Sequence, residues 1–348
     1  MSLESYIQAM PKVELHVHLD GAMQQHTLMV IAEQNEVAEL HKDFDEWVDL
    51  LDNPDNDRLD EIVRMASAWL LQPDDLARVV YDLGVALSKQ NVRYAEVSVN
   101  PSLYMQHGLS FEGFLDAIND GRDRAERGWK IQMAWVLTIS RDEPRSSDEI
   151  SRWATSAFAR KGAVVALGLS GREDAQPLGQ FERAFRTAEK KDIARVPHAG
   201  DILGAEGILE ALDILDPDRI IDGWGAADAP DVLERLAGQE IPLDVSLGRA
   251  VAAGWISSYS EYPLRRLYDE DVKLIIGSDM PSLFHTTLSD EYLAVVEHCG
   301  FEVSELEELA LNAVRYSRLS AEEKATMLAE MAQTYETLRT EHITLETT

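Results

Sequence analysis

The feature that most constrains the fold of this chain is a regular alternation of short apolar runs with longer amphipathic segments. Several of the runs are continuously apolar, which is typical of strands buried on both faces of a parallel sheet. Between them, segments such as residues 73–90, 112–127, 179–191 and 229–238 space Leu, Ala and Val as amphipathic helices do. The candidate strands are residues 13–19, 93–100, 131–138, 164–169, 194–198, 219–222, 242–245 and 273–277.

Eight strands that alternate with helices predict a closed (β/α)8 barrel, the TIM-barrel fold, rather than an open sheet. The chain has 348 residues, of which 45% are apolar and 27% charged, so it can form a barrel of roughly 250 residues with additions. We expect a helical insertion after the first strand, over residues 27–71, placed to cover the barrel mouth. We also expect a helical C-terminal appendage over residues 304–348. The whole chain, residues 1–348, is predicted to be a single domain.

The charge balance narrows the classes of partner. Sixty-three Asp and Glu residues against 32 Lys and Arg residues leave a net charge of -31 at pH 7. Such a surface repels nucleic-acid phosphates and anionic lipid. We therefore predict no nucleic-acid partner and no membrane partner, while the site residues described below predict a small-molecule substrate. The single cysteine, Cys299, excludes an internal disulfide framework and a cysteine-based metal cluster.

The start of the chain gives an expectation about location. Residues 1–12 are too polar for the core of a signal peptide, and the longest apolar runs are shorter than a bilayer-spanning helix. We expect a cytoplasmic protein. The oligomeric state cannot be predicted from these features.

His16 and His18 lie two residues apart on the first predicted strand, so both side chains point to the same face. In a closed barrel that face is the interior, where two imidazoles are costly unless they have partners. A divalent metal would satisfy both, since neutral imidazole suits zinc. A structural role for both histidines is the alternative.

Two further residues stand at predicted strand ends. His198 ends the fifth strand, and Asp279 follows the eighth. The catalytic groups of such barrels lie at the C-terminal ends of the strands, so these residues should converge with the first-strand histidines. Three imidazoles and one carboxylate with room for water form an open, hydrolytic metal site. Four residues satisfied without a metal would be the alternative.

The motifs around these residues resemble one family. Residues 11–22, PKVELHVHLDGA, are similar to the opening motif of the adenosine deaminase family of metal-dependent amidohydrolases. His198-Ala199-Gly200 resembles its fifth-strand motif and Ser278-Asp279 its eighth-strand motif, with weaker similarity over residues 94–101, 168–171 and 311–319. The resemblance implies a (β/α)8 barrel, hydrolytic loss of an amino group, and one zinc ion per chain. The implied ligands are His16, His18, His198 and Asp279.

The chain departs from the family where the acid and the base are expected. The family motif His-Ala-Gly-Glu ends here in Asp201, so the role of the acid that protonates the purine ring falls to a shorter carboxylate. The family His that assists the metal-bound water, in Gly-His-Gly after the sixth strand, aligns without gaps with Asp222. A two-residue shift would place Trp224 there instead. Crowded carboxylates titrate at separated pH values, so two of them can form an acid–base pair.

The substrate positions also differ. Met280 stands where the family has a second Asp that contacts the five-membered ring of the purine, and residues 246–250 replace the seventh-strand Cys-Pro-x-Ser-Asn pattern. Asp20 matches the position that meets the sugar hydroxyl, although a turn residue before Gly21 is the alternative. Gly171 matches a glycine whose backbone faces the ring, although a tight turn would also favour glycine.

These residues together predict a zinc-dependent aminohydrolase that deaminates an adenosine-like or other amine-bearing heterocycle with metal-activated water. The predicted catalytic residues are Asp201 as acid and Asp222 as base, and the predicted substrate contacts are Asp20, Gly171 and Met280. Two alternatives remain: a related hydrolase that cleaves another bond, such as an amide or a lactone, or a barrel that has lost catalysis and binds a ligand.

Overall fold

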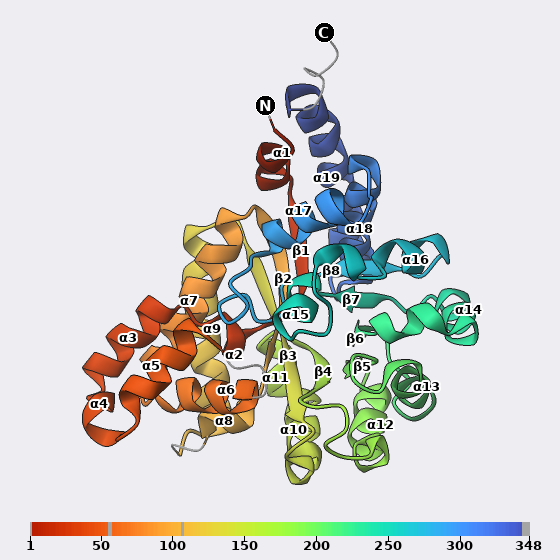
Figure 1. Ribbon diagram of the computed structural model, residues 1–348. Coiled ribbons are helices and arrows are strands. Elements are labelled where there is room, and N and C mark those ends of the chain that lie inside the picture. Colours follow the sequence, from red (N-terminus) through yellow and green to blue (C-terminus); the bar gives the residue numbers. More distant parts are fainter. Residues whose placement is uncertain (1, 55–57, 106–107, 343–348) are drawn as a thin grey trace.

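The computed structural model describes residues 2–54, 58–105 and 108–342, and in this part of the chain eight parallel strands form a barrel surrounded by helices (Figure 1). Neighbours around the barrel follow chain order, which confirms the predicted (β/α)8 fold. The strands are β1 (Lys12–His18), β2 (Val92–Val99), β3 (Gln132–Ser140), β4 (Val164–Ser170), β5 (Ala194–Ala199), β6 (Ile220–Asp222), β7 (Leu243–Val245) and β8 (Leu274–Ile276).

The barrel closes between β8 and β1 through the residues that follow β8. The backbone N–H of His18 donates to the carbonyl of Asp279 at 2.8 Å, and the N–H of Asp279 donates to the carbonyl of His16 at 2.8 Å. This pairing holds Asp279 beside the end of β1. The closing contact therefore brings one predicted ligand next to two others.

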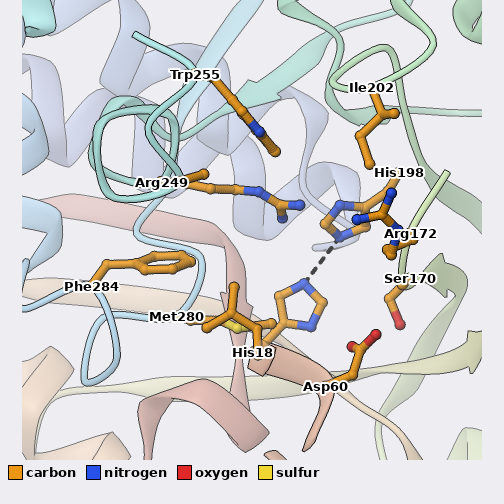
Figure 2. Close-up of a pocket in the computed structure, with 13 residues that line it drawn as sticks. His18, Asp60, Ser170, Arg172, His198, Ile202, Arg249, Trp255, Met280 and Phe284 are labelled. Carbon is orange, nitrogen blue, oxygen red and sulfur yellow. Dashed lines mark hydrogen bonds between the residues drawn. The ribbon is translucent and has the colours of Figure 1, made fainter. Parts of the chain in front are cut away.

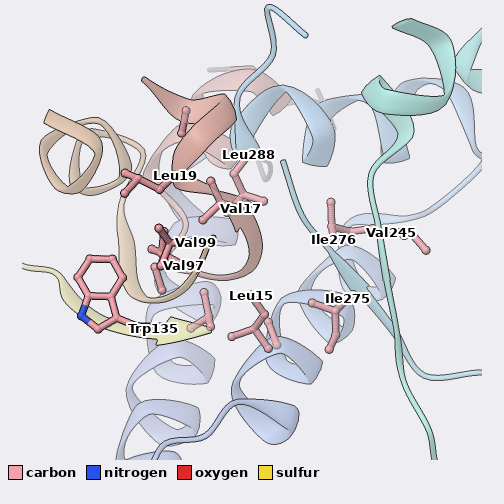
Figure 3. Packing of buried hydrophobic residues seen from close by; sticks show 14 of the residues in the cluster. Leu15, Val17, Leu19, Val97, Val99, Trp135, Val245, Ile275, Ile276 and Leu288 are labelled. Carbon is pink, nitrogen blue, oxygen red and sulfur yellow. The ribbon is translucent and has the colours of Figure 1, made fainter. Parts of the chain in front are cut away.

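The strand bounds agree with the sequence expectation to within two residues because the strands are buried along almost their whole length. All seven residues of β1 are buried. Figure 3 shows Leu15 and Val17 of β1 packed with neighbouring buried side chains of the core, among them Val97 of β2 and Ile276 of β8. Burial on both faces explains why several of the strands appear in the sequence as continuous apolar runs.

Helices cover the outside of the barrel. The helix α7 (Pro73–Lys89) begins with proline at its first turn and α9 (Phe111–Gly128) begins at a serine cap, both common helix starts. The other helices that follow strands are α10 (Ser147–Ala154), α11 (Ala157–Lys161), α12 (Glu182–Lys190), α13 (Gly204–Ile214), α14 (Pro230–Gln239), α15 (Leu247–Ala252) and α16 (Leu264–Asp269).

The predicted insertion after β1 is helical, as expected. After the short α2 (Leu19–Ala22) it contains α3 (Gln25–Gln34), α4 (Val37–Leu40), α5 (Phe44–Asp52) and α6 (Leu59–Ala68). Residues 55–57 lie outside the described residues. Leu59 and Asp60 at the start of α6 reach the cavity described below, so this part of the insertion lies at the barrel mouth. The short α8 (Pro101–Met105) follows β2.

The C-terminal appendage is also helical, and it packs against the start of the chain. It contains α18 (Val303–Tyr316) and α19 (Ala321–His342), which follow α17 (Leu288–His298), while residues 343–348 lie outside the described residues. The hydroxyl of Tyr6 on α1 (Leu3–Ala9) donates to Glu307 at 2.5 Å. The hydroxyl of Tyr335 donates to the carbonyl of Pro11 at 2.7 Å. None of the helices described here is both long enough and apolar enough to cross a membrane.

Candidate metal and catalytic site

The four predicted metal ligands meet at the C-terminal end of the barrel. His18 Nε2 lies 3.1 Å from His198 Nε2, the pair joined by a dashed line in Figure 2. Asp279 Oδ1 lies 3.5 Å from His16 Nε2 and 3.7 Å from His18 Nε2. One ring nitrogen from each histidine fits within 4.8 Å of the others. Such separations suit one ion held at about 2.0–2.2 Å from each donor.

The backbone around the cluster adopts conformations that side chains other than glycine seldom allow. Asp279 has φ of 55° and Asp222 has φ of 69°, in the left-handed region that non-glycine residues seldom adopt. Two residues before Asp279, a Cβ at Gly277 would lie 2.4 Å from His16 Cβ, so only glycine lets the chain pass this close. Strain of this kind concentrates at functional sites, where the surrounding structure holds it.

The donor atoms fit a divalent metal ion. Both ring nitrogens of His16 and Oδ1 of Asp279 are buried and make no hydrogen bond to any residue that the structure describes. Buried polar atoms are costly without a partner, and nearly all of them have one. A cation between the imidazoles and the carboxylate would satisfy these atoms, and nitrogen and oxygen donors are those that zinc takes.

Asp222 lies at the end of β6 and contacts one of the histidines. Its Oδ2 is 3.0 Å from Nδ1 of His198. A carboxylate on the far nitrogen of a ligand histidine fixes the ring orientation and raises its basicity. Burial raises the pKa of Asp222, and the nearby Arg249 guanidinium opposes that effect. Trp224, the alternative at this position, instead stacks on Trp255 with ring centroids 6.3 Å apart.

Arg249, on α15, reaches into the site, and the sequence reasoning missed it. Its Nη1 lies 2.8 Å from Asp279 Oδ2, and its Nη2 lies 3.0 Å from Asp201 Oδ2. Nη1 is also 3.5 Å from Asp222 Oδ2. The guanidinium lies over the ring of Trp255, 5.3 Å from its centroid. One cation therefore contacts the three carboxylates that were expected to gather here.

Asp201 follows β5 on a loop that a second missed residue holds. Glu173 is 2% exposed, and its carboxylate accepts hydrogen bonds from the backbone N–H groups of Gly200 at 2.6 Å, Ile202 at 2.8 Å and Leu203 at 2.8 Å. Burial, followed by a hydrogen bond with the Asp201 carboxyl, raises the pKa of Glu173 to about 7. Glu173 follows the residues 168–171 that resemble the family, but no spacing rule relates it to the loop after β5.

A cavity of about 280 Å³ opens beside the histidines. Figure 2 shows Trp255, Phe284 and Met280 around it, with Arg249 pointing toward His198. Two of the predicted substrate residues, Gly171 and Met280, line this cavity. Its lining residues are His18, Leu59, Asp60, Ser170, Gly171, Arg172, His198, Ile202, Arg249, Ala253, Trp255, Met280 and Phe284.

Asp20, the third predicted substrate residue, does not line this cavity in the described structure. Its carboxylate accepts hydrogen bonds from the Tyr104 hydroxyl and, at 3.4 Å, from the backbone N–H of Asn100. Burial raises the pKa of Asp20 to about 7, and the hydrogen bond from Tyr104 opposes the rise. Asp20 therefore has hydrogen-bond partners just after β2 and on α8, and its contact with substrate stays a prediction.

Fold and site define a class of protein: a (β/α)8 barrel with a cluster of potential metal ligands at its mouth. A family model described as "Adenosine deaminase" matches residues 11–334. The chain belongs to the adenosine deaminase family, which confirms the resemblance carried by the motifs. It is a hydrolase of the deaminase type, and its histidine cluster supports a divalent metal ion.

Individual relatives agree with the family match. The chain is 30% identical over 330 residues to an aminodeoxyfutalosine deaminase of Streptomyces avermitilis, covering 94% of this chain and 92% of that one. It is 26% identical to an adenine deaminase of Acinetobacter baylyi, covering 96% of this chain and 100% of that one.

Solved structures are similar over nearly the whole length. An adenine deaminase from Arthrobacter aurescens superposes with a TM-score of 0.86 and 25% identity, over 94% of this chain and 100% of that one. An amidohydrolase from Burkholderia ambifaria with bound zinc superposes with a TM-score of 0.89 and 24% identity, over 98% and 95% of the two chains. At that identity, the second comparison supports the fold alone.

Proposed function

We propose that the protein is a zinc-dependent aminohydrolase that removes the amino group from a small, adenine-like heterocycle. The observation that carries this proposal is the cluster of His16, His18, His198 and Asp279 beside a cavity with aromatic and apolar walls. Relatives are named as deaminases of adenine, adenosine and aminodeoxyfutalosine, which supports a deaminase activity on a compound of this kind.

In this proposal the four clustered residues hold the metal. Zinc, when bound by such ligands, lowers the pKa of water toward about 7 and so supplies a nucleophile at neutral pH. Asp222 accepts the proton that this chemistry releases. Its Oδ2 is used by His198, which leaves Oδ1 as the oxygen for that proton.

Asp201 serves as the acid that protonates the ring nitrogen or the leaving amine. Its side chain is 5% exposed, pairs with Arg249 and is hydrogen-bonded to the buried carboxyl of Glu173. Burial raises the pKa of Glu173, and the hydrogen bond between the two carboxyls requires a proton that they can share. The pair of carboxyls replaces the single, longer acid of the family.

The cavity accounts for the class of substrate. Trp255, Phe284 and Met280 offer apolar surface for a flat ring, and Gly171 lets the backbone approach it. Gly171 has φ of 86°, and a Cβ there would lie 3.3 Å from the Asp142 carboxylate, so a side chain at this position is disfavoured. Without a second carboxylate at Met280, the cavity suits a substrate that does not need an acceptor there.

We also propose that residues 1–348 act as one domain, because α1 at the start of the chain packs against α17 and α19 near its end. The cytoplasmic location stays a prediction from the sequence.

The test is a measurement of ammonia release by zinc-loaded protein from a panel that contains adenine, adenosine and larger adenine nucleosides. We expect release from at least one compound, lost in His198→Ala and kept in His298→Ala, a matched change of a histidine on the outer helix α17. Binding of panel compounds without any turnover would instead indicate a barrel that has lost catalysis. Turnover of amides or lactones alone would indicate a hydrolase of another bond.

A further inference from the structure

Arg249 has a rigidly built position at the start of α15. Glu291 on α17 accepts hydrogen bonds from the backbone N–H groups of Leu247 at 2.8 Å and Gly248 at 3.0 Å. A Cβ at Gly248 would lie 2.3 Å from Glu291 Oε1, so a larger residue would push this carboxylate away. The hydroxyl of Ser246 accepts from the N–H of Arg249 at 3.4 Å. The first turn of the helix is therefore anchored, and the arginine extends from a fixed base.

The guanidinium uses its two ends for two different carboxylates. Nη1 donates to Asp279 Oδ2 at 2.8 Å, and Nη2 donates to Asp201 Oδ2 at 3.0 Å. Trp255 covers the guanidinium at 5.3 Å, which limits its freedom to turn. A planar fork with fixed donor directions can join two carboxylates in a way that a single ammonium cannot.

The contact with Asp279 decides which of its oxygens faces the histidines. Oδ2 is held by Arg249, while Oδ1 points toward His16 and His18, at 3.5 Å and 3.7 Å from their Nε2 atoms. Oδ1 makes no hydrogen bond to the described residues. The arginine thus leaves one oxygen of the carboxylate available at the centre of the cluster.

We propose that Arg249 is a positioning residue for the metal site: it aims Asp279 Oδ1 at the histidines and ties Asp201 to the same centre. The proposal rests on the function proposed above. Hydrogen-bonding partners of metal ligands commonly contribute 10–100-fold to metal affinity. The guanidinium also repels a dication, but Asp201, Asp222 and Asp279 surround it and offset that repulsion.

The test is the zinc dissociation constant, measured by competition with a chelator. Arg249→Met removes both contacts and should weaken zinc binding by about 10–100-fold. Arg249→Lys keeps the charge but cannot span both carboxylates, so it should weaken binding by a smaller factor. Arg172→Met, the matched change of an arginine that lines the same cavity and pairs with Asp174, should leave zinc affinity within about threefold, inside the usual effect of a remote change.

Zinc binding by Arg249→Met that equals or exceeds that of the wild type would overturn the proposal, because charge repulsion would then outweigh positioning. Circular dichroism establishes that each variant is folded. If Arg249→Met does not fold, Arg249→Lys decides alone, and an affinity equal to wild type overturns the proposal. His16→Ala provides the reference: if it keeps its zinc, the metal site of the proposed function fails, whatever the arginine variants do.

Discussion

Replacement of Asp222 by asparagine separates two roles that one carboxylate could have. Asparagine keeps the size of the side chain, and its amide oxygen can still accept from His198 Nδ1, which lies 3.0 Å from Asp222 Oδ2. The amide cannot accept a proton at neutral pH. Asp222→Asn therefore preserves the orientation of His198 and removes the base.

The size of the effect follows from these roles. Loss of a general base commonly costs about 10²–10⁴-fold in rate, which corresponds to roughly 2.7–5.4 kcal/mol of activation free energy. A fault in the orientation of His198 would instead appear as weaker metal binding, by about 10–100-fold, and excess zinc would repair it. At saturating zinc we therefore expect kcat of Asp222→Asn to fall at least about 100-fold, with little change in KM.

The assay is ammonia release at saturating substrate and zinc, with the metal content of the same sample measured by elemental analysis. Asp228→Asn is the matched control, because Asp228 lies shortly after β6 but is exposed and pairs with Arg266 on the surface. A kcat for Asp222→Asn within about threefold of wild type under metal saturation, far short of the usual contribution of a base, would refute the base assignment. Asp222 would then serve only to orient His198.

Three further predictions concern the cavity, its supporting loop and the base of the barrel. We expect kcat/KM for adenosine to lie well below an ordinary value of about 10⁵ M⁻¹s⁻¹. Met280→Asp should raise kcat/KM for adenosine by restoring a polar contact. No rise would show that residue 280 does not limit substrate choice. Glu173→Gln should lower the free energy of unfolding by at least about 1.5–3 kcal/mol in urea titrations, since an amide has one acceptor oxygen for three backbone N–H groups; unchanged stability would contradict this. Lys12 is fully buried, its Nζ donates to the carbonyls of Met10 and Gln90, and burial lowers its pKa to about 7. The unfolded chain keeps the Lys12 proton up to about pH 10.5, whereas the folded chain loses it near pH 7. Between these pH values the free energy of unfolding of the wild type should therefore rise by roughly a few kcal/mol more than that of Lys12→Met. Parallel pH profiles of the two proteins would refute the assignment.

The sequence predicts those parts of the fold in which neighbouring residues of one strand share the same burial or the same face. The barrel strands are buried on both faces, so several of them appear as apolar runs with recognisable ends. His16 and His18 could be assigned together because residues two apart on a strand share a face. His198 and Asp279 followed because the ends of parallel strands meet at one end of a barrel.

The residues that sequence reasoning missed depend on loops rather than on strands. Arg249 reaches Asp279 and Asp201 only because of the path of the turn after β7 and the anchoring of α15, and no spacing rule relates these three positions. Glu173 meets the loop after β5 through the path of the loop after β4. The partner of Asp20 was not foreseen either, because Tyr104 comes from a helix after the next strand, while the contact of Asp20 with substrate stays a prediction.

The measurement that tests the central claim most directly is the metal content per chain of purified wild type, His198→Ala and Asp279→Ala after equilibration with zinc and removal of excess metal. One cluster of three histidines and one carboxylate accounts for about one ion per chain in the wild type and a large loss in both variants. Equal zinc content in all three proteins would contradict the account, because the metal would then lie elsewhere or not be bound by these residues.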